Sequence, residues 1–444
     1  MENVHILLNS GSRGILIHIH YKEACAELSA KVNILFISQF FPPEGGAAAN
    51  RAFAHSKYWV KFGNKVTVLC ETPCYMIDEA KRDNTKKCIV EKINGIDCVR
   101  IPVFWASNRS SVKKRLLNQI SFMFGAIRYG KKLLKEQRFD IVIASSPPLF
   151  AGIAGKKLAR KANARFIFEV RDLWPESIVA MGKMSDKNPI VVIAKKVAKS
   201  LYKHADVLVT VTKGLKKKLE NRISGKEVTL IYNGADMSDI SNGSSGVEKG
   251  LLVYSGILGY FQGIDVIIRA IPYMKHKAIK CIIIGDGIEK NKLMEKARDL
   301  KLGKRLVFVG SVSHREAIEY VKRADICLVS MIDSPITNEA LPSKVFEYAA
   351  CGKPVAASLA GEMAEMIREY NIGLVSEPED LDAFAKTLDK MLKDEKMKKE
   401  FSENARHFAE LFSRERMAKE YLDLMESLLS KKTQEHRTND YVIK

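Results

Sequence analysis

Two glutamates, a serine and a lysine lie close together within residues 336–358, around the predicted start of a helix. Seven residues separate Glu339 from Glu347, and Ser343 and Lys344 lie between them. Backbone N–H groups in the first turn of a helix have no intrahelical partner, and with the helix dipole they favour an anion such as phosphate. The Lys344 ammonium adds a positive charge at this end. We therefore expect Ser343 and Lys344 to bind phosphate.

The residues around this site predict a short helix. Pro342 suits its first turn, because the ring presets φ and no N–H is lost, and Gly352 is expected to end it. Glu347 then lies one turn after Ser343 on the same face, whereas Glu339 precedes the helix in a loop. Carboxylates accept hydrogen bonds from vicinal hydroxyls, so one acid would bind a ribose and the other a transferred sugar. The alternative is a surface helix with solvated glutamates.

This pattern is similar to the signature of the retaining glycosyltransferase family 4, which has the GT-B fold. Residues 41–51 (FPPEGGAAANR), 171–177 (RDLWPES) and 341–348 (LPSKVFEY) resemble the branch with L-fucosamine-type transferases of surface-polysaccharide biosynthesis. The similarity extends over residues 32–424. It implies an α/β protein with two Rossmann-like domains facing each other across a cleft, the first binding an acceptor and the second a nucleotide sugar.

Length and element order also indicate two domains, since 444 residues fit two units of about 200. Residues 1–30 contain no convincing signal peptide or membrane span, and no later segment has the roughly 18 consecutive apolar residues that a span needs. We expect an amino extension of unclear structure at 1–30, an acceptor-binding domain at 31–236, a linker at 237–250, a nucleotide-sugar-binding domain at 251–405, a helix returning to the first domain at 406–428, and a loose polar tail at 429–444.

In the first domain, a predicted strand at 31–39 leads into a loop with Gly45 and Gly46 and then a helix at 48–62. Strand, glycine loop and helix open a Rossmann-like unit, whose ligands bind beyond the carboxyl end of the strand. The two glycines would let backbone amides approach a phosphate or an acceptor hydroxyl. A turn that requires positive φ is the alternative explanation.

Another predicted strand ends where Arg171, Asp172, Trp174 and Glu176 gather. Charged groups at the end of a strand favour a ligand site, and we expect Arg171 and Asp172 to line the reaction cleft, with Asp172 contacting a sugar. Many family members have a histidine at the position that aligns with Arg171. The role of that histidine therefore cannot be assigned to Arg171. The alternative is a structural Arg–Asp pair. The predicted catalytic residues are Glu339, Asp172 and Arg171.

The second domain departs from the family pattern after its first predicted strand, at 251–256. An arginine and a lysine usually bind the donor diphosphate there, whereas this chain has Ile257 and Gln262. Gln262 donates neutral hydrogen bonds, which are weaker than charge-assisted ones, so Lys344 is the remaining cation. The predicted donor-binding residues are Gly256, Gln262, Gly285, Asp286, Gly287, Ser343, Lys344 and Glu347.

The formal net charge of +20 implies affinity for anions. No nucleic-acid-binding motif accompanies it, so we expect no nucleic-acid partner. Residues 113–138 predict a basic amphipathic helical pair with residues 122–124 beside it, which fits an anionic membrane surface; the alternative is a core-facing helix with solvated lysines. The eight cysteines form no CxxC pair and are interpreted as reduced packing residues. These features predict a cytoplasmic protein, peripheral on the inner face of the cell membrane.

The sequence therefore predicts a glycosyltransferase that moves an amino or deoxy sugar from a nucleotide-sugar donor, expected to be UDP-linked, to a saccharide or a lipid-diphosphate-linked acceptor. The resemblance implies retention of configuration, with the leaving phosphate helping to deprotonate the acceptor. No enzyme nucleophile, cofactor or metal is expected. Two alternatives are a nucleotide-sugar 2-epimerase of GT-B fold and a non-catalytic peripheral membrane scaffold.

Overall fold

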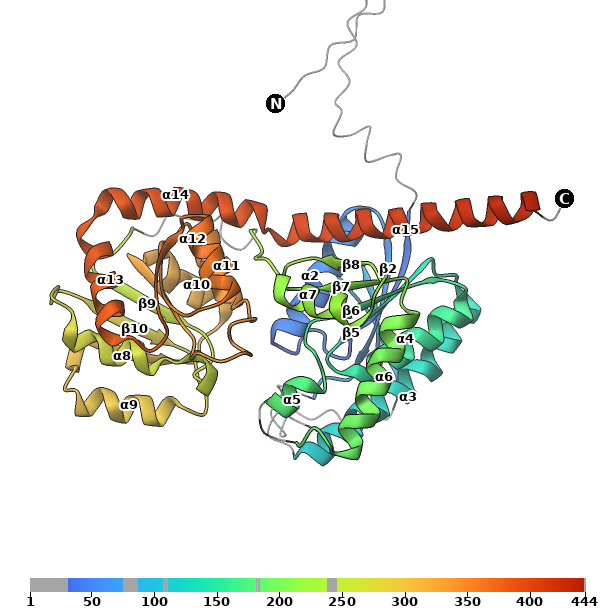
Figure 1. The fold of residues 1–444 in the computed structure, drawn as a ribbon, viewed down its shortest axis with the longest axis horizontal. Coiled ribbons are helices and arrows are strands. Elements are labelled where there is room, and N and C mark those ends of the chain that lie inside the picture. Colours follow the sequence, from blue (N-terminus) through green and yellow to red (C-terminus); the bar gives the residue numbers. More distant parts are fainter. Residues whose placement is uncertain are drawn as a thin grey trace, which may run out of the picture.

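The computed structural model describes residues 31–74, 87–106, 111–180, 182, 184–237 and 246–442, with side chains described as far as Lys431. The predicted amino extension and most of the predicted linker lie outside these residues. The described chain forms two α/β domains, each built on its own sheet (Figure 1). This confirms the predicted fold class.

The N-terminal domain contains an eight-stranded sheet in the order β3-β4-β2-β1-β5-β6-β7-β8, parallel except for β3. Its strands are β1 (Asn33–Ile37), β2 (Lys65–Glu71), β3 (Ile89–Ile93), β4 (Ile96–Ile101), β5 (Ile141–Ser146), β6 (Arg165–Val170), β7 (Val207–Thr210) and β8 (Val228–Leu230). Its helices are α2 (Ala47–Lys61), α3 (Val112–Glu136), α4 (Leu149–Ala162), α5 (Glu176–Ala180), α6 (Pro189–His204) and α7 (Lys213–Arg222).

The C-terminal domain contains a parallel six-stranded sheet in the order β11-β10-β9-β12-β13-β14. Its strands are β9 (Leu251–Ser255), β10 (Lys280–Ile284), β11 (Leu306–Gly310), β12 (Ile326–Ser330), β13 (Val355–Ser358) and β14 (Gly373–Ser376). Its helices are α8 (Asp265–Ala270), α9 (Lys290–Asp299), α10 (His314–Arg323), α11 (Ser343–Ala350), α12 (Glu362–Glu369), α13 (Leu381–Lys393) and α14 (Glu395–Leu411), with 3₁₀ turns η2 (Tyr260–Gln262), η3 (Ile271–Tyr273) and η4 (Gly303–Arg305).

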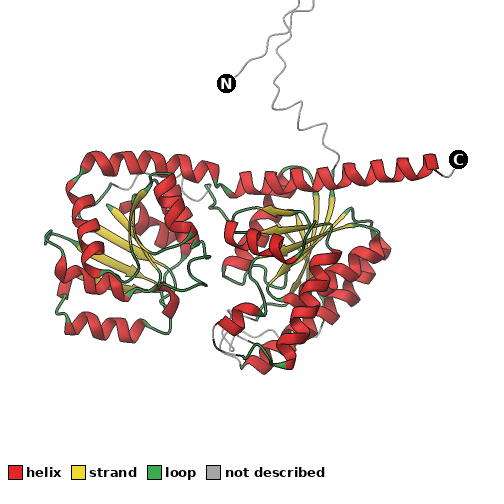
Figure 2. Ribbon diagram, viewed as in Figure 1, coloured by secondary structure: helices red, strands yellow, loops and turns green. Residues whose placement is uncertain are grey.

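Both sheets are sandwiched between helices, as the secondary-structure view shows (Figure 2). The inner strands are near-continuous buried runs, because a parallel sheet covered on both faces needs apolar side chains on both, whereas the edge strands β3, β8, β11 and β14 are only partly buried. The strand order reverses between β1 and β5 in the first sheet and between β9 and β12 in the second. Ligands of open α/β sheets bind beyond the carboxyl ends of the strands at such reversals. The fold therefore places two candidate site regions, one in each domain.

The last helix, α15 (Arg414–Val442), returns from the C-terminal domain to the N-terminal one (Figure 1). Trp59 on α2 donates its Nε1–H to the carbonyl of Ala418 over 3.0 Å, and its ring lies 5.2 Å from that of Tyr421. The helix begins at Arg414 rather than at 406 and continues to Val442, so the expected loose tail at 429–444 is wrong over most of its length. The tail is polar, but its lysines, glutamates and glutamine are good helix formers.

The predicted helical pair at 113–138 is also wrong, because α3 is one helix of 25 residues. Gly125 and Gly130 lie inside it without interrupting it. A Cβ on Gly125 would lie 2.3 Å from Ile101, and one on Gly130 would lie 2.4 Å from Leu158. These glycines therefore let α3 pack closely against β4 and α4. Within the described residues, no helix combines the length and apolar composition that a bilayer-spanning segment requires.

Candidate active site

Two adjoining cavities lie between the domains, and Ala47 and Asn233 line both of them. The first, called the donor cavity, has a volume of about 670 Å³. The second, called the sugar cavity, has a volume of about 640 Å³. The structure brings most of the predicted site residues to these two cavities. The donor cavity is lined by Gly46, Gly256, Gln262, Gly285, Asp286, Ser343, Lys344 and Glu347, and the sugar cavity by Arg171, Asp172 and Glu339.

Helix α11 begins in the donor cavity, directly after the loop that follows β12. Pro342 is its N-cap residue and makes no side-chain capping bond. The first N–H groups of the helix, those of Ser343 and Lys344, have no intrahelical partner and are open to an anion. The predicted helix start is therefore correct, and it lies at the strand-order reversal between β9 and β12.

Lys344 is the most unusual charged group of this cavity. Its ammonium is buried and has no hydrogen-bond partner in the structure, and it lies 3.8 Å from the ring centroid of Tyr254. Burial lowers the pKa of Lys344 to about 7, although the carboxylate of Glu347 acts in the opposite direction. A Cβ on Gly256 would lie 2.8 Å from Lys344 Nζ. Gly256 therefore leaves the space that the lysine occupies.

The other predicted glycines serve close backbone packing. Gly285 has φ +134°, and a Cβ there would lie 1.9 Å from the carbonyl oxygen of Gly256. The adjacent Asp286 accepts hydrogen bonds from the N–H of Gly287 at 2.7 Å and from Lys290 Nζ at 3.1 Å. Asp286 thus organises its own turn, and Gly287 is not among the residues that line the donor cavity.

The predicted glycine loop precedes α2. Gly46 is the N-cap residue of α2 with φ 102°, a conformation that favours glycine, and it lines the donor cavity. Gly45 is exposed and is not among the residues lining either cavity. Of the two glycines, Gly46 is therefore the one placed to approach a ligand.

In the sugar cavity, Glu339 comes from the loop before α11, as predicted. Its carboxylate forms an ion pair with Lys218 on α7 of the other domain. Nearby, Arg222 and Glu176 form a second ion pair at 2.7 Å. Both pairs lie among the residues that line this cavity.

Arg171 lines the sugar cavity, but its guanidinium is engaged inside the N-terminal domain. It donates to Ser145 Oγ at 2.9 Å and to the carbonyl of Pro147 at 3.0 Å. Among the described residues, Arg171 forms no ion pair with Asp172 and lies instead 3.8 Å from the carboxylate of Glu169. Burial raises the pKa of Asp172, against hydrogen bonds from Ser177 and from a backbone N–H. This geometry favours a supporting role for Arg171. The contact of Asp172 with a sugar stays a prediction, and Asp172 lines the cavity in which that contact would occur.

The domains also contact each other through Glu362, at the start of α12. Its carboxylate accepts the backbone N–H groups of Lys213 at 2.8 Å and Gly214 at 3.1 Å, which form the first turn of α7. A carboxylate at a helix N-terminus is stabilised by the free amides and the helix dipole. This contact holds α7 of the N-terminal domain against the C-terminal domain.

Sequence reasoning missed several lining residues. Arg51, in the donor cavity, pairs with buried Glu169 at 2.9 Å. Although burial raises the pKa of Glu169, the charges of Arg51 and Arg171 outweigh it, and the net pKa is lowered. Arg51 is the last residue of segment 41–51, which resembles the family, so its place in that segment could have marked it as a site residue. Lys218 and Arg414 come from distant helices, and nothing in their local sequence marks them.

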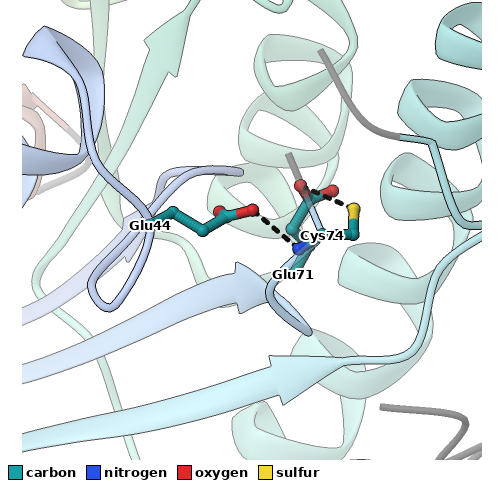
Figure 3. Close-up of side chains that lie close together, drawn as sticks. All are labelled: Glu44, Glu71 and Cys74. Atoms are coloured by element: carbon teal, nitrogen blue, oxygen red, sulfur yellow. Dashed lines mark hydrogen bonds between the residues drawn. The ribbon is translucent and has the colours of Figure 1, made fainter. Parts of the chain in front are cut away.

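A group of three potential metal ligands, Glu44, Glu71 and Cys74, lies near the glycine loop, with ligand atoms within 4.8 Å of one another (Figure 3). The group is internally hydrogen-bonded: the N–H of Cys74 donates to Glu44 at 2.8 Å, and its thiol donates to Glu71 at 3.3 Å. Gln39 and Asn118 also donate to Glu71, at 2.7 and 3.1 Å. Burial, reinforced by Glu44, raises the pKa of Glu71 well above its usual range. We interpret the group as a network that fastens the glycine loop to β2.

Comparisons with known proteins agree with this arrangement. The model described as Glycosyltransferase Family 4 matches residues 45–239, and the one described as Glycosyl transferases group 1 matches residues 238–408. The chain is 23% identical over 309 residues to the "Probable glycosyltransferase WbjE" of Pseudomonas aeruginosa, covering 66% of this chain and 75% of that protein. It is 28% identical over 207 residues to an α-1,4-N-acetyl-D-galactosaminyltransferase of Campylobacter jejuni, covering 45% and 55%.

Two solved structures show the same fold. Sucrose-phosphate synthase from Thermosynechococcus elongatus has a TM-score of 0.70 at 17% identity, over 90% of this chain and 100% of that one. HepE of Anabaena, solved with UDP-glucose, has a TM-score of 0.62 at 17% identity, over 89% and 99%. Taken with the family matches and the two cavities, the chain is a glycosyltransferase of the GT-B fold, in which the family 4 model matches the N-terminal part and the group 1 model matches the C-terminal part.

Proposed function

We propose that this enzyme transfers an amino or deoxy sugar from a UDP-linked donor to a saccharide or lipid-diphosphate-linked acceptor in surface-polysaccharide assembly. The observation that carries the proposal is Lys344, a buried ammonium without a hydrogen-bond partner, next to the free N–H groups of Ser343 and of Lys344 itself. A buried amine without an acceptor is costly to a folded protein. An anionic ligand that fills the donor cavity explains why the chain retains it.

Cleavage of the donor builds negative charge on the leaving diphosphate. The amides at the start of α11, the helix dipole and the Lys344 ammonium are fixed in place before the reaction, and such preorganised groups often contribute several kcal/mol. We assign the ribose hydroxyls to Glu347, which lines the same cavity. We assign a hydroxyl of the transferred sugar to Glu339, which lines the adjoining sugar cavity.

The names of similar proteins support the substrate classes. The structure of HepE contains UDP-glucose, which supports a UDP-linked donor for this chain. The Campylobacter jejuni relative is named for transferring N-acetylgalactosamine to an acceptor on diphospho-undecaprenol, which supports an amino sugar and a lipid-diphosphate acceptor. We further infer retention of configuration without an enzyme nucleophile or a metal, as expected for family 4, and membership of the branch with L-fucosamine-type transferases.

We also propose that the N-terminal domain binds an anionic membrane, where a lipid-linked acceptor is found. Of the three apolar residues predicted for the membrane face of α3, Phe122 is buried in the core, whereas Phe124 is 63% exposed. On α6, Ile190 and Ile193 are 47% and 62% exposed. Lysines accompany these residues on both helices, and helix α4 lies between the two (Figure 1). Exposed apolar side chains next to lysines suit a lipid headgroup region.

The test of the donor site is a thermal-shift series with UDP, GDP and ADP on the wild type and on Glu347→Ala. A ligand that binds only the folded protein raises its Tm by mass action. We expect a selective UDP shift that disappears in Glu347→Ala. If none of the three nucleotides at millimolar concentration changes the Tm of the wild type, the donor-site assignment is wrong.

A product assay distinguishes the transferase from a nucleotide-sugar 2-epimerase. We expect UDP and an elongated acceptor with the anomeric configuration of the donor, established by NMR of the product. Accumulation of an isomerised sugar without an acceptor product would favour the epimerase. If the protein binds nucleotide but forms no product with any of a range of acceptors, that result would favour a non-catalytic scaffold.

A further inference from the structure

Arg414 is the first residue of α15 and lies where the chain crosses between the domains for the second time. The two crossings are joined there: Ala235 pairs with Ser413 in an isolated bridge, the N–H of Ala235 donates to the carbonyl of Phe412 at 3.2 Å, and the N–H of Arg414 donates to the carbonyl of Ala235 at 2.9 Å. The backbone of Arg414 is therefore fixed by the crossing itself.

The side chain of Arg414 lines the donor cavity together with Lys344 and Ser343. Its Nε is buried and has no hydrogen-bond partner. The ion pairs of the described residues include none for this guanidinium. Two comparable arginines do have ion-pair partners. Arg51, in the same cavity, binds Glu169, and Arg416, on the same helix, binds Glu420 at 3.3 Å. Arg414 is thus left without a counter-ion at a cavity that is predicted to hold an anion.

Arg414 belongs structurally to the N-terminal domain, because α15 packs on α2. Lys344 belongs to the C-terminal domain. The two unpaired cations therefore line one cavity from opposite domains. The backbone N of Arg414 lies beside Gly234, and the neighbouring Asn233 lines both cavities, so Arg414 joins the donor cavity close to a residue that the two cavities share.

We propose that Arg414 binds the β-phosphate of the nucleoside diphosphate and that this contact draws the two domains together around the donor. The proposal rests on the proposed function, since it requires that the donor cavity binds a nucleoside diphosphate. The β-phosphate joins the nucleotide to the sugar, so it lies where the two cavities adjoin. An arginine binds phosphate through two parallel N–H···O bonds, which suits a contact that must also set the geometry of the closed cleft.

This contact also accounts for the missing cations of the second domain. After β9 the chain has Ile257 and Gln262 in place of two basic residues, and neither supplies a positive charge. Lys344 and Arg414 together restore two positive charges to the cavity, from α11 and α15. In this arrangement, one of the two positive charges comes from the N-terminal domain and the other from the C-terminal domain. Binding of the donor is therefore coupled to closure of the domains.

The experiment compares Arg414→Ala and Arg414→Lys with Arg416→Ala as the matched control on the same helix. Affinities for UDP and UMP are measured by isothermal titration calorimetry, and the radius of gyration is measured by small-angle X-ray scattering with and without UDP. For Arg414→Ala we expect a loss of UDP affinity of about 10- to 100-fold, as for a lost charge-assisted contact, and a change of less than threefold for UMP. Arg414→Lys should recover part of the UDP affinity, and Arg416→Ala should match the wild type.

The scattering measurement tests closure separately. We expect UDP to reduce the radius of gyration of the wild type and of Arg416→Ala, but not that of Arg414→Ala. UDP affinity within twofold of the wild type in Arg414→Ala, or equal losses for UDP and UMP, would overturn the proposal. If Lys344→Met loses UDP binding while Arg414→Ala keeps it, only this inference fails. If the wild type binds no nucleotide at all, the proposed function fails with it.

Discussion

In the sugar cavity the charged side chains have polar partners, whereas in the donor cavity the Lys344 ammonium has no hydrogen-bond partner and Arg414 has no ion pair among the described residues. Glu339 binds Lys218, and Glu176 binds Arg222, across the wall of the sugar cavity. A sugar is a neutral ligand, and a surface of mutually compensated charges and hydrogen-bonding groups suits it. A diphosphate carries negative charge, so a cavity that receives it keeps uncompensated positive charge until the ligand binds. The difference indicates which half of the cleft receives which half of the donor.

The comparison also predicts opposite effects on stability. Removal of one member of a buried ion pair should destabilise the fold, because it leaves the other charge buried without compensation. Removal of a buried charge that has no ion-pair partner should not destabilise the free enzyme, and its effect should appear only in ligand binding. The following substitutions test this difference, starting from the one with the largest expected effect.

Glu169→Gln should break the buried network that holds Arg51 of the donor cavity and Arg171 of the sugar cavity. Glu169 accepts from Arg51 and Ser145 and is 1% exposed, so its loss leaves buried positive charge without compensation. We expect a loss of about 3–5 kcal/mol in the free energy of unfolding, measured by urea denaturation. The control is Glu415→Gln, which breaks the exposed pair with Lys61 and should cost less than about 1 kcal/mol. Equal losses in both variants would refute the distinction.

Lys344→Met should weaken ligand binding without destabilising the fold, because it replaces the buried ammonium with an apolar side chain of similar length. We expect an unchanged or higher Tm together with a loss of UDP affinity of about 100-fold, in the range for loss of one charge-assisted contact. Calorimetry and thermal denaturation measure the two effects. Lys296→Met is the control, since Lys296 binds Asp265 outside the donor cavity. A large fall in Tm with UDP binding intact would show that Lys344 is structural.

Glu339→Gln should affect the reaction more than nucleotide binding, because Glu339 lines the sugar cavity and not the donor cavity. Loss of a charged acceptor to a sugar hydroxyl is expected to cost about 10- to 100-fold in kcat. The Kd for UDP should remain within about threefold of the wild-type value, since UDP carries no sugar at that position. Lys218→Ala, which removes the partner of Glu339, separates the effect of the ion pair from that of the acid. A fall in UDP affinity as large as the fall in kcat would place Glu339 at the nucleotide instead.

The pH dependence of UDP affinity should show the smallest of the expected effects, counted per pH unit. Burial lowers the pKa of Lys344 to about 7 in the free enzyme, and a bound phosphate favours its charged form and so raises that pKa. UDP binding therefore takes up a proton above pH 7, and its affinity should fall as the pH rises from 7 to 9, by at most about tenfold per unit. Lys344→Arg keeps its charge throughout this range and should show a flat profile. A flat profile in the wild type would contradict the assignment.

Much of the fold was predictable from the sequence, because parallel strands covered on both faces read as apolar runs. The start of α11 and the loop with Glu339 were predictable for a related reason, since their signals lie within a few adjacent residues. Arg171 was harder to interpret: its bonds to Ser145 and Pro147 depend on a neighbouring strand that local sequence does not reveal. Arg414 and Lys218 reach the cleft only through the packing of α15 and α7, so no local pattern marks them.

Helix α15 has a consequence for how the protein is made. Its side chains Met417, Tyr421 and Met425 complete a core cluster of the N-terminal domain. A ribosome releases the chain from the N-terminus onward, so that domain emerges without the helix that closes one face of its sheet. The C-terminal domain, synthesised later, has all of its strands before this helix is made. The domain that is translated first is therefore the last to complete its core. A chain that ends before α15 would leave Trp59 without its contacts to that helix, and the uncovered apolar surface would favour aggregation.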